Sequence, residues 1–253
     1  ANAGTGGTIT CTQNSPIQLG TTGSAGFTYT WSPSAGLQGS NSSNPIVSNI
    51  LTTTTYTLTV QDLSNSCTDT AQVIVHVNNT PPVVDANVVG NGQTVCAGTS
   101  VTLFGAGADS YTWNNGVTNN QPFVPTATTT YTVTGTNTSN NCTATDVITI
   151  NVNPIPTVNP ISSIVRCAGT ATGAIQFTGS VPGTQFHWVN SNPAINLAAS
   201  NVGNIQSFIV SNNTPNVMVA TITVTPKYTN NGITCTGTPQ TFTITVNPIP
   251  TVN

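Results

Sequence analysis

A seven-residue sequence, Asn-Pro-Ile-Pro-Thr-Val-Asn, occurs twice in this chain, at 153–159 and again at 247–253. Each copy follows a run in which apolar residues alternate with polar ones, Ile148–Val152 and Phe242–Val246. Such alternation is typical of a β-strand with one buried face. The prolines cannot donate hydrogen bonds to a sheet, so each copy marks a strand end and a stiff connector. The chain is therefore expected to be a tandem array of β-modules.

The large aromatic residues repeat with a similar period. Trp31, Trp113 and Trp188 are separated by 82 and 75 residues, and Tyr56 and Tyr131 by 75. Each of them stands in a segment where aromatic or aliphatic side chains alternate with threonine. Aromatic side chains at equivalent positions of successive repeats favour core packing over sugar stacking. We therefore predict that all five are core residues.

These repeats set the expected domain boundaries. We predict a first β-sandwich over 1–79 and a second over 80–153. A third, divergent β-sandwich is expected over 154–247, because Val217–Val224 replaces the threonine- and tyrosine-rich strand of the other two. Residues 248–253 are expected to be a linker to a following module. Helical periodicity is absent, so helix content should be minimal.

Charged residues are scarce: two basic and five acidic residues make up 3% of the chain. A nucleic-acid binder needs a basic surface to displace counterions, which Arg166 and Lys227 cannot form alone. Apolar runs fall well short of the roughly 18 residues that span a bilayer. We therefore expect no nucleic-acid partner and no membrane insertion.

The sequence offers little for catalysis or metal binding. It lacks glutamate, and its aspartates are spread along the chain, whereas acid–base chemistry needs two carboxylates held close together. His76 and His187 lie within predicted strands without an aspartate or cysteine nearby, so neither suggests a catalytic triad. Zinc-ligand spacing is also missing. The expectation is a protein that is not an enzyme, with no catalytic residue, metal or cofactor.

Six cysteines fall two to each predicted module. An even number with one pair per repeat favours disulfides, and hence an oxidising compartment. Counting alone makes pairing within each module the default. The resulting pairs are Cys11 with Cys67, Cys96 with Cys142, and Cys167 with Cys235.

One order of motifs recurs along the chain: Cys, Ala-Gly-Thr, Val-Thr-Leu, Tyr-Thr-Trp, Thr-Thr-Thr-Tyr-Thr-Val, Asn-Asn-Cys-Thr-Ala-Thr-Asp and Val-Asn-Pro. This order resembles the PKD-like and immunoglobulin-like repeats of secreted Bacteroidetes surface proteins. The resemblance covers nearly the whole chain and is strongest in the first two modules. It implies an all-β fold class, with three tandem Ig-like, PKD-like antiparallel β-sandwich domains arranged as an elongated rod.

The resemblance also implies a role. Such repeats fill very large adhesins, including those of gliding motility, and stalks of type IX secreted proteins. We therefore expect a structural, extracellular protein of the bacterial cell surface, part of a self-assembling filament, stalk or adhesin. Its partners would be copies of itself or adjacent repeats of a longer chain. The alternative is a carbohydrate-binding or spacer module appended to a secreted enzyme, with a surface glycan as partner.

Two further expectations depend on the resemblance. Thr70, in Asp69-Thr-Ala71, matches the short O-glycosylation sequon of Bacteroidetes. A PKD-like topology would also place the two cysteines of one module at opposite ends of the sandwich. Pairing between modules is then the second option, and both options stay open at this point. It joins Cys11 with Cys142 and Cys96 with Cys235, and leaves Cys67 and Cys167 to bond neighbouring modules or subunits.

Overall fold

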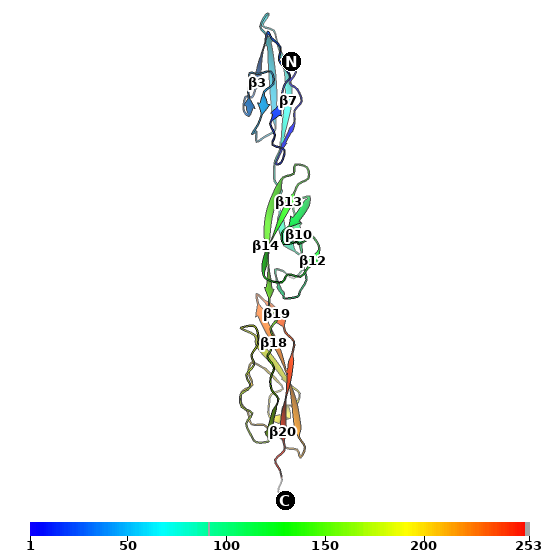
Figure 1. The fold of residues 1–253 in the computed structure, drawn as a ribbon, viewed down its shortest axis with the longest axis vertical. Helices are drawn as coiled ribbons and strands as arrows, with labels where there is room; N and C mark the ends of the chain where they lie inside the picture. Colours follow the sequence, from blue (N-terminus) through cyan, green and yellow to red (C-terminus); the bar gives the residue numbers. More distant parts are fainter. Residues whose placement is uncertain (91, 251–253) are drawn as a thin grey trace. The chain divides into compact units, whose positions relative to one another are not determined.

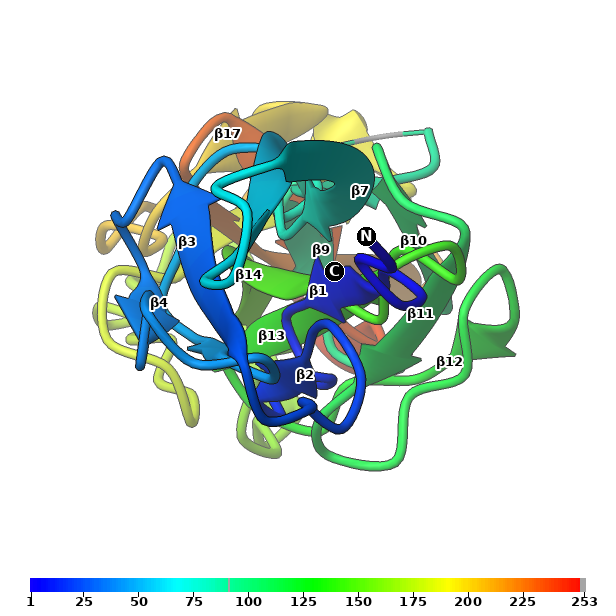
Figure 2. The same cartoon turned by 90° about the horizontal axis from the view of Figure 1, so that it is seen from above.

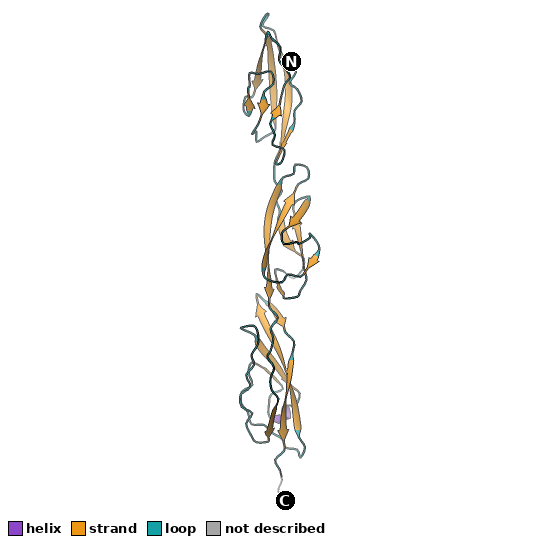
Figure 3. Cartoon of the chain, viewed as in Figure 1, coloured by secondary structure: helices purple, strands orange, loops and turns teal. Residues whose placement is uncertain are grey.

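The computed structural model describes residues 1–90 and 92–250. In this part of the chain the regular structure consists of β-strands and a single 3₁₀ turn, Pro193–Ile195 (Figure 3). The all-β fold class predicted from the alternating sequence is confirmed. The strands β7, β14 and β20 end at Asn78, Asn153 and Asn247, so each copy of the repeated heptapeptide begins at a strand end as expected.

The chain folds into two compact units, which are described separately. The first comprises residues 1–87, 103–121 and 131–148, and the second comprises residues 88–102, 122–130 and 149–253. The division runs through four strands: β8 (Asp85–Val88), β10 (Val101–Ala106), β13 (Thr129–Thr136) and β14 (Thr143–Asn153).

The first unit contains a four-stranded sheet in the order β1-β7-β6-β3, coloured blue to cyan in Figures 1 and 2. Its strands are β1 (Thr8–Thr10), β3 (Phe27–Ser32), β6 (Thr54–Asp62) and β7 (Thr68–Asn78). The first strand runs parallel to β7, whereas β6 is antiparallel to both β7 and β3. Alternation along β6 turns Tyr56 and Leu58 to the buried face.

A small three-stranded sheet covers that buried face. It consists of β2 (Ile17–Gln18), β4 (Leu37–Gln38) and β5 (Ile46–Val47), in the order β2-β5-β4. Leu19 and Val47 on this side pack in one cluster with Trp31, Tyr56 and Val75 of the larger sheet. Two sheets that share one apolar core make this part of the chain a β-sandwich.

The remaining short strands continue both units. They are β8 (Asp85–Val88), β9 (Thr94–Cys96), β11 (Ser110–Trp113) and β12 (Pro122–Phe123). In the first unit β11 pairs antiparallel with β13. In the second unit β9 runs parallel to the end of β14, and β12 pairs antiparallel with the start of β10. The parallel pair of β9 and β14 repeats the arrangement of β1 and β7.

The second unit also contains a six-stranded sheet. Its order is β15-β20-β18-β16-β17, and β19 pairs with the far end of β18. The strands are β15 (Ile164–Cys167), β16 (Gln185–Asn190), β17 (Ser200–Val202), β18 (Met218–Asn230), β19 (Ile233–Thr236) and β20 (Gln240–Asn247). Again the first strand, β15, is parallel to the last, β20.

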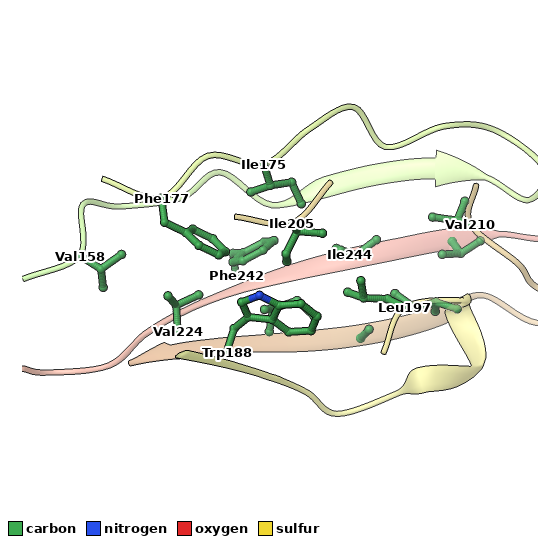
Figure 4. Packing of buried hydrophobic residues seen from close by; sticks show 14 of the residues in the cluster. Val158, Ile175, Phe177, Trp188, Leu197, Ile205, Val210, Val224, Phe242 and Ile244 are labelled. Carbon is green, nitrogen blue, oxygen red and sulfur yellow. The ribbon is translucent and has the colours of Figure 1, made fainter. Parts of the chain in front are cut away.

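The core of this sheet lies under less regular chain. Trp188, Phe242 and Ile244 point from the sheet towards residues such as Phe177 and Ile205 (Figure 4). The covering segments are held by isolated bridges, such as the one between Ile175 and Ile205, instead of full strands. The rings of Phe177 and Phe242 lie 6.4 Å apart and tilted, a favourable arrangement for aromatic pairs.

Four of the five aromatic residues predicted to be core are buried: Trp31, Tyr56, Tyr131 and Trp188. Trp113 differs, because it is only half-buried at the end of β11. Its indole Nε1 donates to the side chain of Asn119 at 3.0 Å. In contrast, the indoles of the two buried tryptophans donate to backbone carbonyls. Trp113 therefore lies at the edge of its core and not inside it.

Candidate functional site

Two disulfides link parts of the chain that are distant in sequence. Cys11, just after β1, bonds to Cys142, just before β14, with 5.0 Å between their Cα atoms. Cys96, the last residue of β9, bonds to Cys235 in β19, with a Cα separation of 5.6 Å. Both separations lie in the usual range for disulfides. These are the pairs expected between predicted modules.

The within-module pairs Cys11 with Cys67, Cys96 with Cys142 and Cys167 with Cys235 do not form, so the default from counting is corrected. Strand geometry gives the reason. Because β1 is parallel to β7, Cys11 lies near the end of β7, whereas Cys67 precedes its first residue. An 11-residue strand separates these positions, which at about 3.3 Å per residue is roughly 36 Å.

The disulfide of Cys11 and Cys142 belongs to a small polar cluster, here called the first joint. It consists of these two cysteines, Asn78 at the end of β7, Thr80, and Asn140 in the hairpin between β13 and β14. The Nδ2 of Asn140 donates to Asn78 Oδ1 at 3.0 Å and to the Thr80 carbonyl at 3.1 Å. Its Oδ1 accepts from the backbone N–H of Cys142 at 2.9 Å. Asn140 is 3% exposed, so its amide is buried and satisfied.

The second joint consists of Cys96, Cys235, Asn153 at the end of β14, and Asn230 at the end of β18. Asn153 Nδ2 donates to the Asn230 carbonyl at 2.9 Å, and Asn230 Nδ2 donates to Asn153 Oδ1 at 3.1 Å. Asn153 and Cys235 are almost fully buried. Each joint thus combines one disulfide with asparagine amides between a strand end and a hairpin.

The first copy of the heptapeptide, residues 153–159, packs closely beside the second joint. A Cβ added to Gly237 would lie 1.7 Å from the Pro156 carbonyl oxygen, so only glycine fits there. Likewise, a Cβ on Gly179 would lie 1.9 Å from the Thr157 carbonyl oxygen. Val158 is buried in the core of the six-stranded sheet. Residues 156–158 are therefore packed against Gly237, Gly179 and the core of the six-stranded sheet.

The joint asparagines were missed at the level of sequence, where only the cysteines were singled out. A signal was present, because Asn153 is the first residue of the repeated heptapeptide and Asn140 lies two residues before a cysteine. Asparagine is common throughout the chain, mostly in turns. That abundance hides the few amides that bridge distant strands.

Hydrogen bonds lower the pKa of two aspartates, Asp62 and Asp109. The side chain and then the backbone N–H of Ser64 lower the pKa of Asp62 below its usual value. The backbone N–H and hydroxyl of Thr138 do the same for Asp109, at 2.8 and 3.0 Å. Asp62 caps its own turn, a common role of aspartate, whereas Asp109 binds a residue 29 positions further along the chain. Across residues 1–90 and 92–250, His, Cys and Asp side chains do not gather into a group of three that could hold a metal.

Thr70, the candidate O-glycosylation residue, lies in β7 and is exposed. Its backbone N–H donates to the side chain of Asp69, whose carboxylate also binds the amino group of Ala1. Modification of Thr70 stays a prediction. None of the helical structure in the described residues is long and apolar enough to cross a membrane.

No protein-family model and no curated protein sequence matches the chain. Similar solved structures include three immunoglobulin domains of titin in an E-to-A variant, at 11% identity and TM-score 0.46, covering 98% of this chain and 96% of that one. Three N-terminal domains of the highly immunogenic outer capsid protein of bacteriophage RB49 are 15% identical, with TM-score 0.44 and coverages of 94% and 95%. Eight N-terminal immunoglobulin domains of Down syndrome cell adhesion molecule are 10% identical, with TM-score 0.47 and coverages of 99% and 36%. The sheets of the chain itself define it as an all-β protein of β-sandwich repeats.

Proposed function

We propose that this chain is a structural segment of an extracellular protein, part of a bacterial surface filament, stalk or adhesin, and that it is not an enzyme. In this proposal the residues 1–79, 80–153 and 154–247 are three Ig-like modules, and 248–253 is a linker. The observation that carries the proposal is the pair of interleaved disulfides at the two joints.

Interleaving gives the chain resistance to cleavage. Along the sequence the bonded cysteines come in the order Cys11, Cys96, Cys142 and Cys235. One cysteine of each disulfide therefore lies between the two cysteines of the other. A backbone cut at any one place between Cys11 and Cys235 therefore leaves the two pieces covalently joined. A segment exposed to proteases outside the cell benefits directly from this arrangement.

Interleaving also limits how far the chain can be stretched. The shortest covalent path from end to end follows residues 1–11, 96–142 and 235–253, which is about 74 residue steps. At roughly 3.5 Å per residue this path extends to about 260 Å, against about 880 Å for the reduced chain. Such a limit suits a segment that transmits force between a cell and a surface.

The joints also suit an environment of changing salt. Their hydrogen bonds join neutral amides and carbonyls. Salt screens interactions between charges, so these contacts should depend little on ionic strength. The same holds for the surface as a whole, because only seven side chains in 253 residues are Lys, Arg, Asp or Glu.

Single-molecule stretching tests the proposal. The variant Cys67→Ser/Cys167→Ser keeps both disulfides, and should stop extending near 260 Å when tethered at its two ends. The variant Cys11→Ser/Cys96→Ser loses both disulfides and should extend to about 880 Å as its sheets unfold. An oxidised chain that reached the longer limit would contradict a role in transmitting force.

The carbohydrate-binding alternative requires exposed aromatic platforms. Trp31 and Trp188 are 2% and 3% exposed, so neither can stack on a sugar without rearrangement. This burial removes two of the three tryptophans as sugar platforms, whereas Trp113 is half-buried and Phe27 is 42% exposed.

A further inference from the structure

Cys67 and Cys167 are the free cysteines of the described residues, and both are exposed. We propose that Cys167 of one copy of this chain and Cys67 of a second copy close a third joint, linking copies head to tail by a disulfide. The inference rests on the proposed structural function and names the partner of the segment. Its basis is that each free cysteine lies in the same local structure as a cysteine of the first or second joint.

The hairpin 62–67, which ends at the free Cys67, matches the hairpin 137–142, which ends at a bonded cysteine. In each hairpin the first residue donates its N–H to the carbonyl of the cysteine, at 2.9 and 3.0 Å. The residue before the cysteine donates back to the carbonyl of the first residue, at 2.8 Å in both. That residue has a left-handed φ in both, 60° at Ser66 and 53° at Asn141. The two hairpins therefore present their cysteines alike.

The asparagine of the joint is also in place. Asn65 Oδ1 accepts from the N–H of the cysteine two residues later at 2.8 Å, as Asn140 Oδ1 does at 2.9 Å. In the first joint Asn140 Nδ2 reaches across to Asn78, and the residue is 3% exposed. The Nδ2 of Asn65 lies 3.2 Å from Asp62 Oδ2, and Asn65 is exposed. The hairpin 62–67 therefore has the local structure of the hairpin in the first joint, but in the described residues no strand end covers it.

The free Cys167 shows the complementary half. It pairs in parallel register with Asn247 at the end of β20, as Cys96 pairs with Asn153 at the end of β14. In both places the residue after the cysteine donates its N–H to the carbonyl of that asparagine, at 3.0 and 2.8 Å. Asn153 is 2% exposed under the hairpin of the second joint, whereas Asn247 is more exposed. This strand end lacks a hairpin to cover it.

The order of the joints shows which half each free cysteine lacks. In each formed joint a strand end takes the hairpin of the predicted module that follows it in sequence. The hairpin 62–67 belongs to the first predicted module, and the strand end at Cys167 belongs to the third. A second copy of the chain supplies what each of them lacks.

The bond is an oxidation of two thiols. Cys67 and Cys167 each lose a proton, and their two electrons pass to an external disulfide such as oxidised glutathione, which is reduced to two thiols. The mechanism is exchange through a mixed disulfide. An oxidant of the same class is needed for the two disulfides already present, so the third requires no new chemistry.

Mixing of two variants tests the inference. Cys67→Ser keeps only the Cys167 end, and Cys167→Ser keeps only the Cys67 end. In a glutathione redox buffer, the wild type should form a ladder of multiples of 25.9 kDa on a non-reducing gel. Each variant alone should stay monomeric, and an equal mixture should give dimers with a Cys67–Cys167 peptide found by mass spectrometry.

Three outcomes would overturn the inference: dimers in either variant alone, a bond between Cys67 and Cys167 within one chain, or no dimers in the mixture. A second measurement tests the joint itself. Asn65→Ala should slow dimer formation about fivefold by removing one hydrogen bond, whereas the exposed Asn41→Ala should not. Equal rates for the two variants would mean that the thiols meet without a joint. The stretching experiment uses a chain without either free thiol, so it can succeed or fail independently.

Discussion

Asn153 and Asn230 exchange hydrogen bonds at the second joint: Asn153 Nδ2 donates to the Asn230 carbonyl, and Asn230 Nδ2 donates to Asn153 Oδ1. The two residues are 77 positions apart in the sequence. This pair joins the end of one long strand to the hairpin end of another, beside the disulfide of Cys96 and Cys235. It makes the second joint specific in orientation as well as covalently closed.

Replacing Asn153 with alanine should therefore destabilise the fold. The change removes two hydrogen bonds to Asn230, each worth about 0.5–1.5 kcal/mol, so the expected cost is about 1–3 kcal/mol. Urea unfolding of Asn153→Ala should show this loss, and the exposed Asn213→Ala should unfold like the wild type. Equal midpoints for both variants would mean that the disulfide alone holds the joint.

Trypsin offers a direct test of the interleaved disulfides, because the chain contains only Arg166 and Lys227 as cleavage sites. A cut after either residue lies between Cys96 and Cys235. Under mild denaturation the singly cut chain should still run as one 25.9 kDa species until reductant is added. In Cys96→Ser/Cys235→Ser the fragments should separate without reductant. Separation of the wild-type fragments without reductant would contradict the observed pairing.

Gly237 is expected to tolerate no side chain. Its added Cβ would overlap the Pro156 carbonyl oxygen, and the backbone of the heptapeptide would have to move. Gly237→Ala should lower the free energy of unfolding by about 1–3 kcal/mol. The adjacent Thr238→Ala is a matched control, because Thr238 is exposed. A thermal melt distinguishes the two, and an unchanged Gly237→Ala would show that the heptapeptide is not held against this hairpin.

The lowered pKa of Asp109 predicts how the stability of the fold changes at acidic pH. Hydrogen bonds from Thr138 lower the pKa of Asp109 in the folded chain relative to its usual value of 3.8. A lowered folded pKa means that stabilisation is complete above the unfolded pKa and is lost as pH falls through the folded pKa. Stability should therefore be flat from neutral pH to about 5 and fall below about 4. Asp109→Asn should show a smaller fall in melting temperature between pH 5 and 2, and an equal fall would contradict the assignment.

Much of the fold could be predicted from local pattern. The alternation around Tyr56 and Leu58 predicts a strand, which forms over Thr54–Asp62. The prolines after Asn153 predict the end of β14 correctly. Trp113 was misplaced because an alternating pattern does not reveal how deep a core is at the end of a short strand. The division into three modules and their elongated arrangement stay predictions.

The candidate site was only partly predictable. Cysteine spacing left two pairings open, and the choice depends on β1 running parallel to β7, a long-range relation that no local pattern encodes. Asn140 and Asn153 act through partners more than 60 residues away in the sequence. Residue type alone does not separate them from the many asparagines in turns.

The parallel pairing of β1 with β7 also bears on the time course of synthesis. Cys11 has to remain a thiol while 131 further residues are made before Cys142 exists, which takes on the order of 10 s at typical rates. During this interval the nearest thiol in sequence is Cys67. Early formation of β1 and β7 would keep these two thiols at opposite ends of one strand. In that case the sheet would keep Cys67 away from Cys11 until Cys142 has been made.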